Sequence, residues 1–172
     1  IITTAYQKVK DNDRLSPADP FDMGAGHVDP GKPGHKGSMF DPGLVYDAGF
    51  LEYLGFLCDA EPSTFANPSA TCALLESIGI PTDASDLNLA SIGVAELAGS
   101  QTVTRTVTSV AAKTVTWKAK VDAPAGYDVT VSPSTITLAP GDTASYQVTI
   151  TNNGGGPVGE WRFGSLTWMG TG

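Results

Sequence analysis

Alternation of β-branched apolar residues with polar residues dominates the second half of this 172-residue chain. A period of two places one set of side chains on one face of a sheet, so each such run predicts a half-buried strand. Two further strands are expected at 89–97 and 161–168, which makes about seven in all. The clearest alternating runs are 102–108, 115–121, 128–131, 135–138 and 144–150.

Turns rich in proline, glycine and asparagine separate these runs, as at 139–142 and 152–157. About seven short strands at regular spacing predict a two-sheet β-sandwich. Residues 86–172 contain no cysteine, which argues against an antibody-type domain with an inter-sheet disulfide. A fibronectin type III-like sandwich fits this region better, and the fold class expected for the chain is mainly β.

Residues 1–85 are organised differently, because X-Pro and Pro-Gly turns interrupt them repeatedly. Proline removes a backbone donor and keeps its predecessor out of helical geometry, so regular structure there must be short. Apolar spacing predicts one short helix at 50–58 and another at 73–78, which ends before Gly79. Residues 1–10 are expected to be the end of a helix.

Charge and composition exclude several classes of function. The 18 acidic and 10 basic residues give a net charge of −8, which repels a phosphate backbone and disfavours nucleic-acid binding. No apolar run approaches the roughly 20 residues of a membrane helix, so no membrane association is expected. Two cysteines are too few for a four-thiolate zinc site.

Searches for catalytic and metal-binding motifs find none. No window matches Gly-x-Ser-x-Gly, and His27 and His35 lack the spacing and the glutamate of a zinc protease. Asp11 and Asp13 alternate as in a calcium loop, but the pattern stops there. Ser38 lies in a Gly-Ser-Met stretch that matches a subtilisin-type nucleophile motif only in part, and we interpret it as a loop residue. No catalytic, cofactor-binding or metal-binding residue is therefore predicted.

Cys58 and Cys72 allow two interpretations. One cysteine could pair with His27 as a nucleophile, which the sequence leaves open. Two cysteines that flank a short segment fit a disulfide better.

Six blocks of the sequence occur together in one order. They read FDMGAGHVDP at 21–30, DPGLVYD at 41–47, EYLGFLC at 52–58, DLNLASI at 86–92, TRTVTSV at 104–110 and FGSLTW at 163–168. In this order they closely resemble the subtilisin-like serine proteases of the plant subtilase type. The resemblance covers essentially the whole chain.

This resemblance implies three parts. Residues 1–48 resemble the C-terminal end of an α/β subtilisin-like catalytic domain, and 49–85 resemble a connector with short helices. In that connector Cys58 and Cys72 occupy the positions of a family disulfide. Residues 86–172 resemble the fibronectin type III-like domain without its last strand. The disulfide would enclose about 15 residues, which stabilises by about 3 kcal/mol, and it implies a secreted, extracellular protein.

The resemblance also implies a function for the chain. The Asp, His and Ser triad and the oxyanion asparagine of the family belong to motifs that do not occur in this sequence. The expected function is that of a C-terminal fragment of a secreted subtilisin-like serine endopeptidase, non-catalytic by itself, which scaffolds the protease domain. Its partners would be the parent's own catalytic domain and, through the parent, protein or peptide substrates, with a homodimer left open. No cofactor is expected.

A stand-alone β-sandwich module for binding or adhesion is the alternative. Such modules usually display clustered exposed aromatic side chains, whereas Trp117, Trp161 and Trp168 are expected to lie on strands and fill the core. The fragment interpretation makes a second prediction, which concerns the apolar side chains of residues 1–48. These side chains should lack partners in the chain alone: Ile1, Ile2, Tyr6, Val28, Leu44, Val45 and Tyr46.

Overall fold

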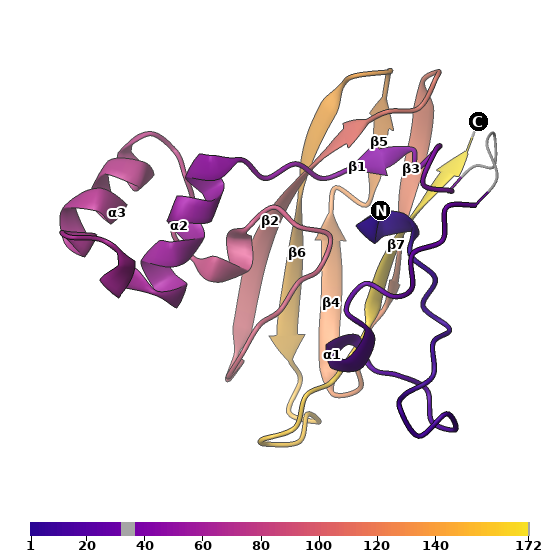
Figure 1. Cartoon of the computed structure of the whole chain (residues 1–172), viewed down its shortest axis with the longest axis horizontal. Coiled ribbons are helices and arrows are strands. Elements are labelled where there is room, and N and C mark those ends of the chain that lie inside the picture. Colours follow the sequence, from indigo (N-terminus) through magenta and orange to yellow (C-terminus); the bar gives the residue numbers. More distant parts are fainter. Residues whose placement is uncertain (32–36, 172) are drawn as a thin grey trace.

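Two antiparallel sheets form the body of the protein in the computed structural model, which describes residues 1–31 and 37–171 (Figure 1). One sheet has the strand order β1-β2-β6-β4 and the other β5-β3-β7. The expected mainly β fold of about seven strands is confirmed. The strands are β1 (Leu44–Val45), β2 (Ser100–Ser109), β3 (Val115–Asp122), β4 (Tyr127–Ser132), β5 (Thr135–Leu138), β6 (Thr143–Asn152) and β7 (Ser165–Thr171).

The longest pairing joins β2 to β6, from Ser100 opposite Thr151 to Thr108 opposite Thr143. Along β2 the residues at odd positions from 103 to 109 are buried, and those between them are more exposed. The alternation in the sequence is therefore the alternation between core and solvent. The buried apolar side chains of the two sheets form one cluster, made of Leu44, Val103, Val107, Ile136, Leu138, Tyr146 and Val148.

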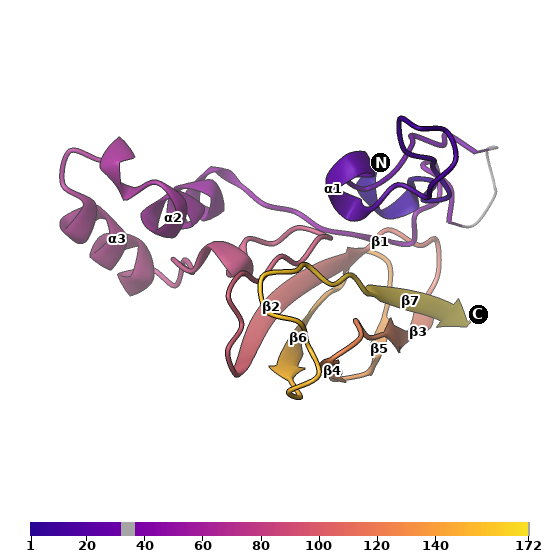
Figure 2. The same cartoon turned by 90° about the horizontal axis from the view of Figure 1, so that it is seen from below.

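A helical arm leaves the sandwich on one side (Figures 1 and 2). It consists of α2 (Phe50–Ala60), the 3-10 turn η2 (Pro62–Thr64) and α3 (Pro68–Ser77). The helix expected at 50–58 is confirmed as α2. The second helix begins at Pro68, well before 73, because the side chain of Asn67 caps its first turn at the Ala70 N–H and proline is tolerated there.

The prediction of a strand at 89–97 is wrong. These residues, all of them described, form neither strand nor helix. They follow the 3-10 turn η3 (Ala84–Asp86). The place beside β2 that such a strand would take is filled by side chains, as described below. Glu96 has a positive φ of 51°, which is incompatible with an extended strand.

Two other predicted elements are corrected. Residues 1–10 form only the 3-10 turn η1 (Ile2–Thr4), followed by an irregular chain that includes the short α1 (Pro20–Met23). The last strand begins at Ser165 rather than at 161, because 161–164 continue the β6–β7 connection. No helix in the described part of the chain is long and apolar enough to cross a membrane.

Candidate functional site

The strongest contact between residues 1–48 and the sandwich is β1, which lies beside β2. Leu44 pairs with Ser109 and Val45 with Thr108, and the Val110 N–H donates to the Gly43 carbonyl at 2.9 Å. Leu44 is 6% exposed and belongs to the core cluster. The prediction that Leu44, Val45 and Tyr46 lack partners in this chain is therefore wrong.

Tyr46 extends this contact into the core. Its hydroxyl shares a hydrogen bond of 2.6 Å with the hydroxyl of Tyr146, which is 2% exposed. Burial, and after it the neighbouring Tyr146, raise the pKa of Tyr46 far above its usual value, although Arg105 acts in the opposite direction. Tyr146 in turn lies edge-on to Trp168, with ring centroids 5.0 Å apart. The hydroxyl pair joins Tyr46 to β6, and the ring of Tyr146 continues the contact to β7 of the other sheet.

A buried guanidinium lies next to this pair. Arg105 donates to the carbonyls of Leu89 at 2.8 Å, Thr104 at 2.9 Å and Ser91 at 3.1 Å. Burial lowers its pKa, while Tyr146 and Asp86 favour the charged form. The side chain therefore fixes the path of residues 89–91 over the sandwich.

Two side chains of the DLN block cover the edge of β2. The Asp86 carboxylate accepts from the Thr104 N–H at 2.7 Å. Asn88 accepts from the Thr106 N–H at 2.8 Å and donates to the Thr106 carbonyl at 2.9 Å, as a paired strand residue would. Its amide also donates to the Asp47 carbonyl at 2.8 Å, so one side chain connects β2 to the segment that follows β1. Side chains two residues apart thus satisfy backbone groups two residues apart.

An aromatic cluster forms a second contact between the halves of the chain. Phe21 of α1 lies edge-on to Trp161 and to Phe163, with centroids 5.0 and 5.4 Å away. Trp161 is 51% exposed, so the expectation that it fills the core is wrong. Trp117 and Trp168, by contrast, pack against the core cluster as expected.

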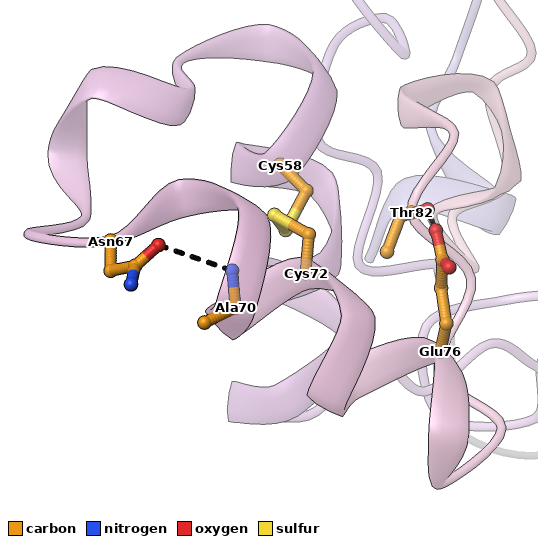
Figure 3. The surroundings of a disulfide bond; sticks show 6 residues. All are labelled: Cys58, Asn67, Ala70, Cys72, Glu76 and Thr82. Atoms are coloured by element: carbon orange, nitrogen blue, oxygen red, sulfur yellow. Dashed lines mark hydrogen bonds between the residues drawn. A yellow bond between two sulfur atoms is a disulfide. The ribbon is translucent and has the colours of Figure 1, made fainter.

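Cys58 and Cys72 form a disulfide bond that joins α2 to α3 (Figure 3). Because both sulfurs are in this bond, neither is a thiolate nucleophile for His27. Near the same helix, the Thr82 hydroxyl donates to Glu76 at 2.7 Å. The disulfide bond fixes the two helices of the arm, α2 and α3, to each other.

The remaining candidate residues that the structure describes are not brought together. His27 is a loop residue whose backbone pairs with Tyr6 and whose Nδ1 donates to the Val28 carbonyl. Ser38 lies in a turn with a β-bridge to Asp41, while His35 lies outside the described residues.

No group of three or more His, Cys, Asp or Glu in the described part of the chain could hold a metal ion. A hollow of about 100 Å³ lies beside Val9 and Asp22. Ligand pockets measure roughly 300–1,000 Å³, so this hollow is too small for a substrate of ordinary size. The contacts described above between residues 1–48 and the sandwich are called the interface below.

The residues of this interface were not predicted from the sequence. One of them, Arg105, could have been found from the sequence pattern. Arg105 stands between Val103 and Val107 on the inward-facing side of its alternating run. A charged residue at a core position requires buried partners, so the pattern itself marks Arg105. Nothing comparable marks Tyr46, whose partner Tyr146 is 100 residues away.

Comparison with known proteins identifies relatives of both halves. The family described as "Fibronectin type-III domain" matches residues 86–172. Subtilisin-like protease SBT3.16 of Arabidopsis thaliana is 36% identical over 98% of this chain and 22% of that protein. Subtilisin-like protease SBT2.5 of the same plant is 36% identical over 80% of this chain and 16% of that protein. Subtilisin-like protease SBT3 of Solanum lycopersicum is 36% identical over 94% and 21%.

The chain spans about a fifth of the length of these relatives. The similarity includes residues of both contacts to the sandwich, because it extends over nearly the whole chain. The resemblance inferred from the six sequence blocks is thereby confirmed. The chain is therefore similar over nearly its whole length to a part of plant subtilisin-like proteases, and its residues 86–172 belong to the family of fibronectin type-III domains.

Proposed function

We propose that the chain is the non-catalytic C-terminal part of a subtilisin-like serine endopeptidase, in which it packs against the catalytic domain and stabilises it. The carrying observation is that similarity to proteases four to five times longer extends over 98% of the chain, including the loop-rich residues before the sandwich. A free sandwich domain would have no need of that segment. Peptide substrates would reach the chain only through the parent enzyme.

Exposed apolar side chains on residues 1–48 support this packing. A segment that packs against a further domain leaves apolar side chains exposed when that domain is absent. In a catalytic domain these side chains would complete a larger core. The large ones that are exposed here are Ile1, Ile2, Tyr6, Leu15, Phe21, Val28 and Phe40.

The disulfide supports a further part of the proposal, namely that the protein is exported. Bonds of this kind persist in oxidising compartments and are rare in the cytosol. Treatment of freshly isolated natural protein with a thiol-alkylating reagent tests this point. Cys58 and Cys72 should stay unlabelled until a reductant is added, and labelling without reductant would contradict export.

The experiment that tests the protease proposal is to sequence the coding DNA upstream of Ile1. An open frame that continues into Gly-Thr-Ser-Met, His and Asp motifs would support it. A start codon and signal peptide directly before Ile1 would overturn it. That result would favour the alternative function, a stand-alone β-sandwich module that binds ligands by itself.

One observation favours that alternative. Phe21, Trp161 and Phe163 form an exposed aromatic cluster, and stacking on exposed aromatic rings is a common way to bind sugars and peptides. A titration of the chain with soluble plant or bacterial polysaccharides, followed by Trp fluorescence, tests it. A saturable shift that Trp161→Ala removes would support a binding module, and no shift at millimolar ligand would exclude this class.

A further inference from the structure

We infer that the sandwich contains a strand-acceptor site along β2, and that residues 43–47 occupy it as a donor strand supplied by the segment before the helical arm. The sandwich then begins at Gly43, and residues 49–85 are an insertion into it. The matched fibronectin type-III domain, by contrast, begins at residue 86. The acceptor site follows from the contacts of this chain alone, whereas its meaning for a protease rests on the proposed function.

The first argument is burial. Leu44 is as buried as the core residues of β5, and it belongs to the cluster that β2, β5 and β6 form. Without the donor segment, the core would lack the Leu44 side chain and would contain a cavity of that size. A cavity of this kind destabilises a domain strongly, because the surroundings relax only in part.

The second argument is the fit of Gly43. Its φ of +78° belongs to the left-handed region, and a Cβ at this position would overlap the indole ring of Trp117. The donor backbone therefore lies directly against a ring that packs on the core, where only glycine fits. Such a close approach is typical of a specific site rather than of a loop resting on a surface.

The third argument is the edge of β2. Beside the donor strand, Asp86 and Asn88 satisfy the backbone of Thr104 and Thr106. Asn88 also donates to the Asp47 carbonyl, at the end of the donor segment. The donor strand and the two side chains together cover one continuous stretch of β2, which would otherwise be open to pairing with other chains.

The fourth argument is polar. The Tyr46 hydroxyl reaches Tyr146 inside the sandwich. Without Tyr46, the buried Tyr146 hydroxyl would lose this partner, which is costly in a low-dielectric core. Apolar, steric, backbone and hydroxyl contacts thus all hold one short segment in place.

The site predicts that the two parts stay together after the chain is cut. A recognition sequence for a site-specific protease, placed between Glu61 and Asn67 in the arm, allows the folded full chain to be cleaved. Reduction of the Cys58–Cys72 bond then leaves no covalent link. Size-exclusion chromatography of the wild-type protein should show one species that contains both pieces, and separation into two species would overturn the inference.

Contacts inside the arm could also hold the pieces together, so variants of the site decide the question. In Gly43→Ala the cleaved and reduced protein should separate. Gly141→Ala is the matched control, because Gly141 has a similar φ of +84° but no atom within 4 Å of an added Cβ. This control should stay associated. If both variants behave alike, the donor strand does not hold the pieces.

Hydrogen exchange on the uncut chain gives an independent readout. The Val110 N–H, which donates to the Gly43 carbonyl, should exchange at least about tenfold faster in Gly43→Ala than in Gly141→Ala. Asn88→Ala should accelerate the exchange of the Thr106 N–H in the same way, while the exchange of the Val110 N–H, which reports on Gly43, stays unchanged. Unchanged exchange at Val110 in a folded Gly43→Ala protein would overturn the inference, whatever the upstream DNA encodes.

Discussion

At the scale of single residues, Arg105 shows how a charged side chain can act as a structural support. Its guanidinium donates to the carbonyls of Leu89 and Ser91, which have no helix or strand to satisfy them. Replacement by an apolar residue leaves these two partly buried acceptors without their donor, and because water can reach part of them the total cost is about 1–3 kcal/mol. The side chain thus supplies hydrogen bonds to residues 89–91, which form no strand that could supply them.

Arg105→Met should therefore lower the free energy of unfolding by about 1–3 kcal/mol, measured by urea denaturation with Trp fluorescence. Arg162→Met is the control, because Arg162 is exposed and pairs with the exposed Glu160 at 2.9 Å. An exposed pair contributes about 0–1 kcal/mol. Equal losses in the two variants would show that the carbonyls of 89–91 find water when Arg105 is removed.

Tyr46 predicts a specific dependence on alkaline pH. Its pKa is raised in the folded protein, mainly by burial, while an unfolded tyrosine ionises near its model value of 10.0. The folded state thus retains a proton that the unfolded state loses, and the free energy of unfolding falls as the pH rises above 10. For one such group the slope approaches roughly 1.4 kcal/mol per pH unit.

Tyr46→Phe should reduce this alkaline slope, although it also lowers stability at pH 7 through loss of the hydroxyl pair with Tyr146. Urea midpoints at pH 8, 9, 10 and 11 provide the measurement. Tyr6→Phe is the matched control, since Tyr6 lies at the surface and is half exposed. A slope unchanged by Tyr46→Phe would mean that Tyr46 ionises in the folded protein as it does in the unfolded chain.

At the scale of elements, the sequence predicted those whose pattern is local. The alternation at 102–108 and 144–150 corresponds to β2 and β6, and the apolar spacing at 50–58 corresponds to α2. Each pattern repeats over at least two periods, so it stands out from the chain around it. Most of the sandwich was therefore predictable from its strands.

The elements that could not be predicted depend on distant partners. β1 has only two residues, too few for any period, and it exists because β2 lies beside it. The apolar residues of 89–97 alternate like a strand, but Asp86 and Asn88 already occupy the edge where that strand would pair. For the same reason the interface around Tyr46 could not be predicted, because its geometry is set by contacts far apart in the sequence.

The helical arm predicts a local effect of reduction. The Cys58–Cys72 bond encloses residues 14 apart, and a loop of this length contributes about 3 kcal/mol. The double variant Cys58→Ser/Cys72→Ser should therefore speed amide exchange in α3, while amides of β2 and β6 in the same sample serve as the internal control. Equal acceleration in all of these elements would show that the arm and the sandwich unfold as one unit.

At the scale of the whole molecule, the chain divides by density of contacts rather than by length. The sandwich has continuous ladders of backbone hydrogen bonds. Residues 1–31 have only turns, the short helices η1 and α1, and two isolated bridges, Tyr6 with His27 and Lys10 with Pro17. Figure 2 shows this segment on one side of the two sheets. Segments with few buried contacts unfold locally at a low cost in free energy.

Amides of residues 1–31 should accordingly exchange on the order of a thousandfold faster than those of β2 and β6 in the isolated chain. Hydrogen exchange followed by mass spectrometry measures both regions in one sample. Leu44–Val45 should behave like β2, with which they pair. Uniformly slow exchange over residues 1–31 would contradict the proposal that this segment needs the rest of a protease as its partner.

The contacts of the Asn88 side chain affect how the helical arm can be altered in evolution. It bonds both Asp47 and Thr106, so the chain leaves the sandwich for the arm and returns to it at nearly the same point. A loop with its two feet held together can be lengthened at little cost in closure entropy. Residues 49–85 are thus a position at which a whole structural module can be replaced, in evolution or by design, while the two sheets keep their register.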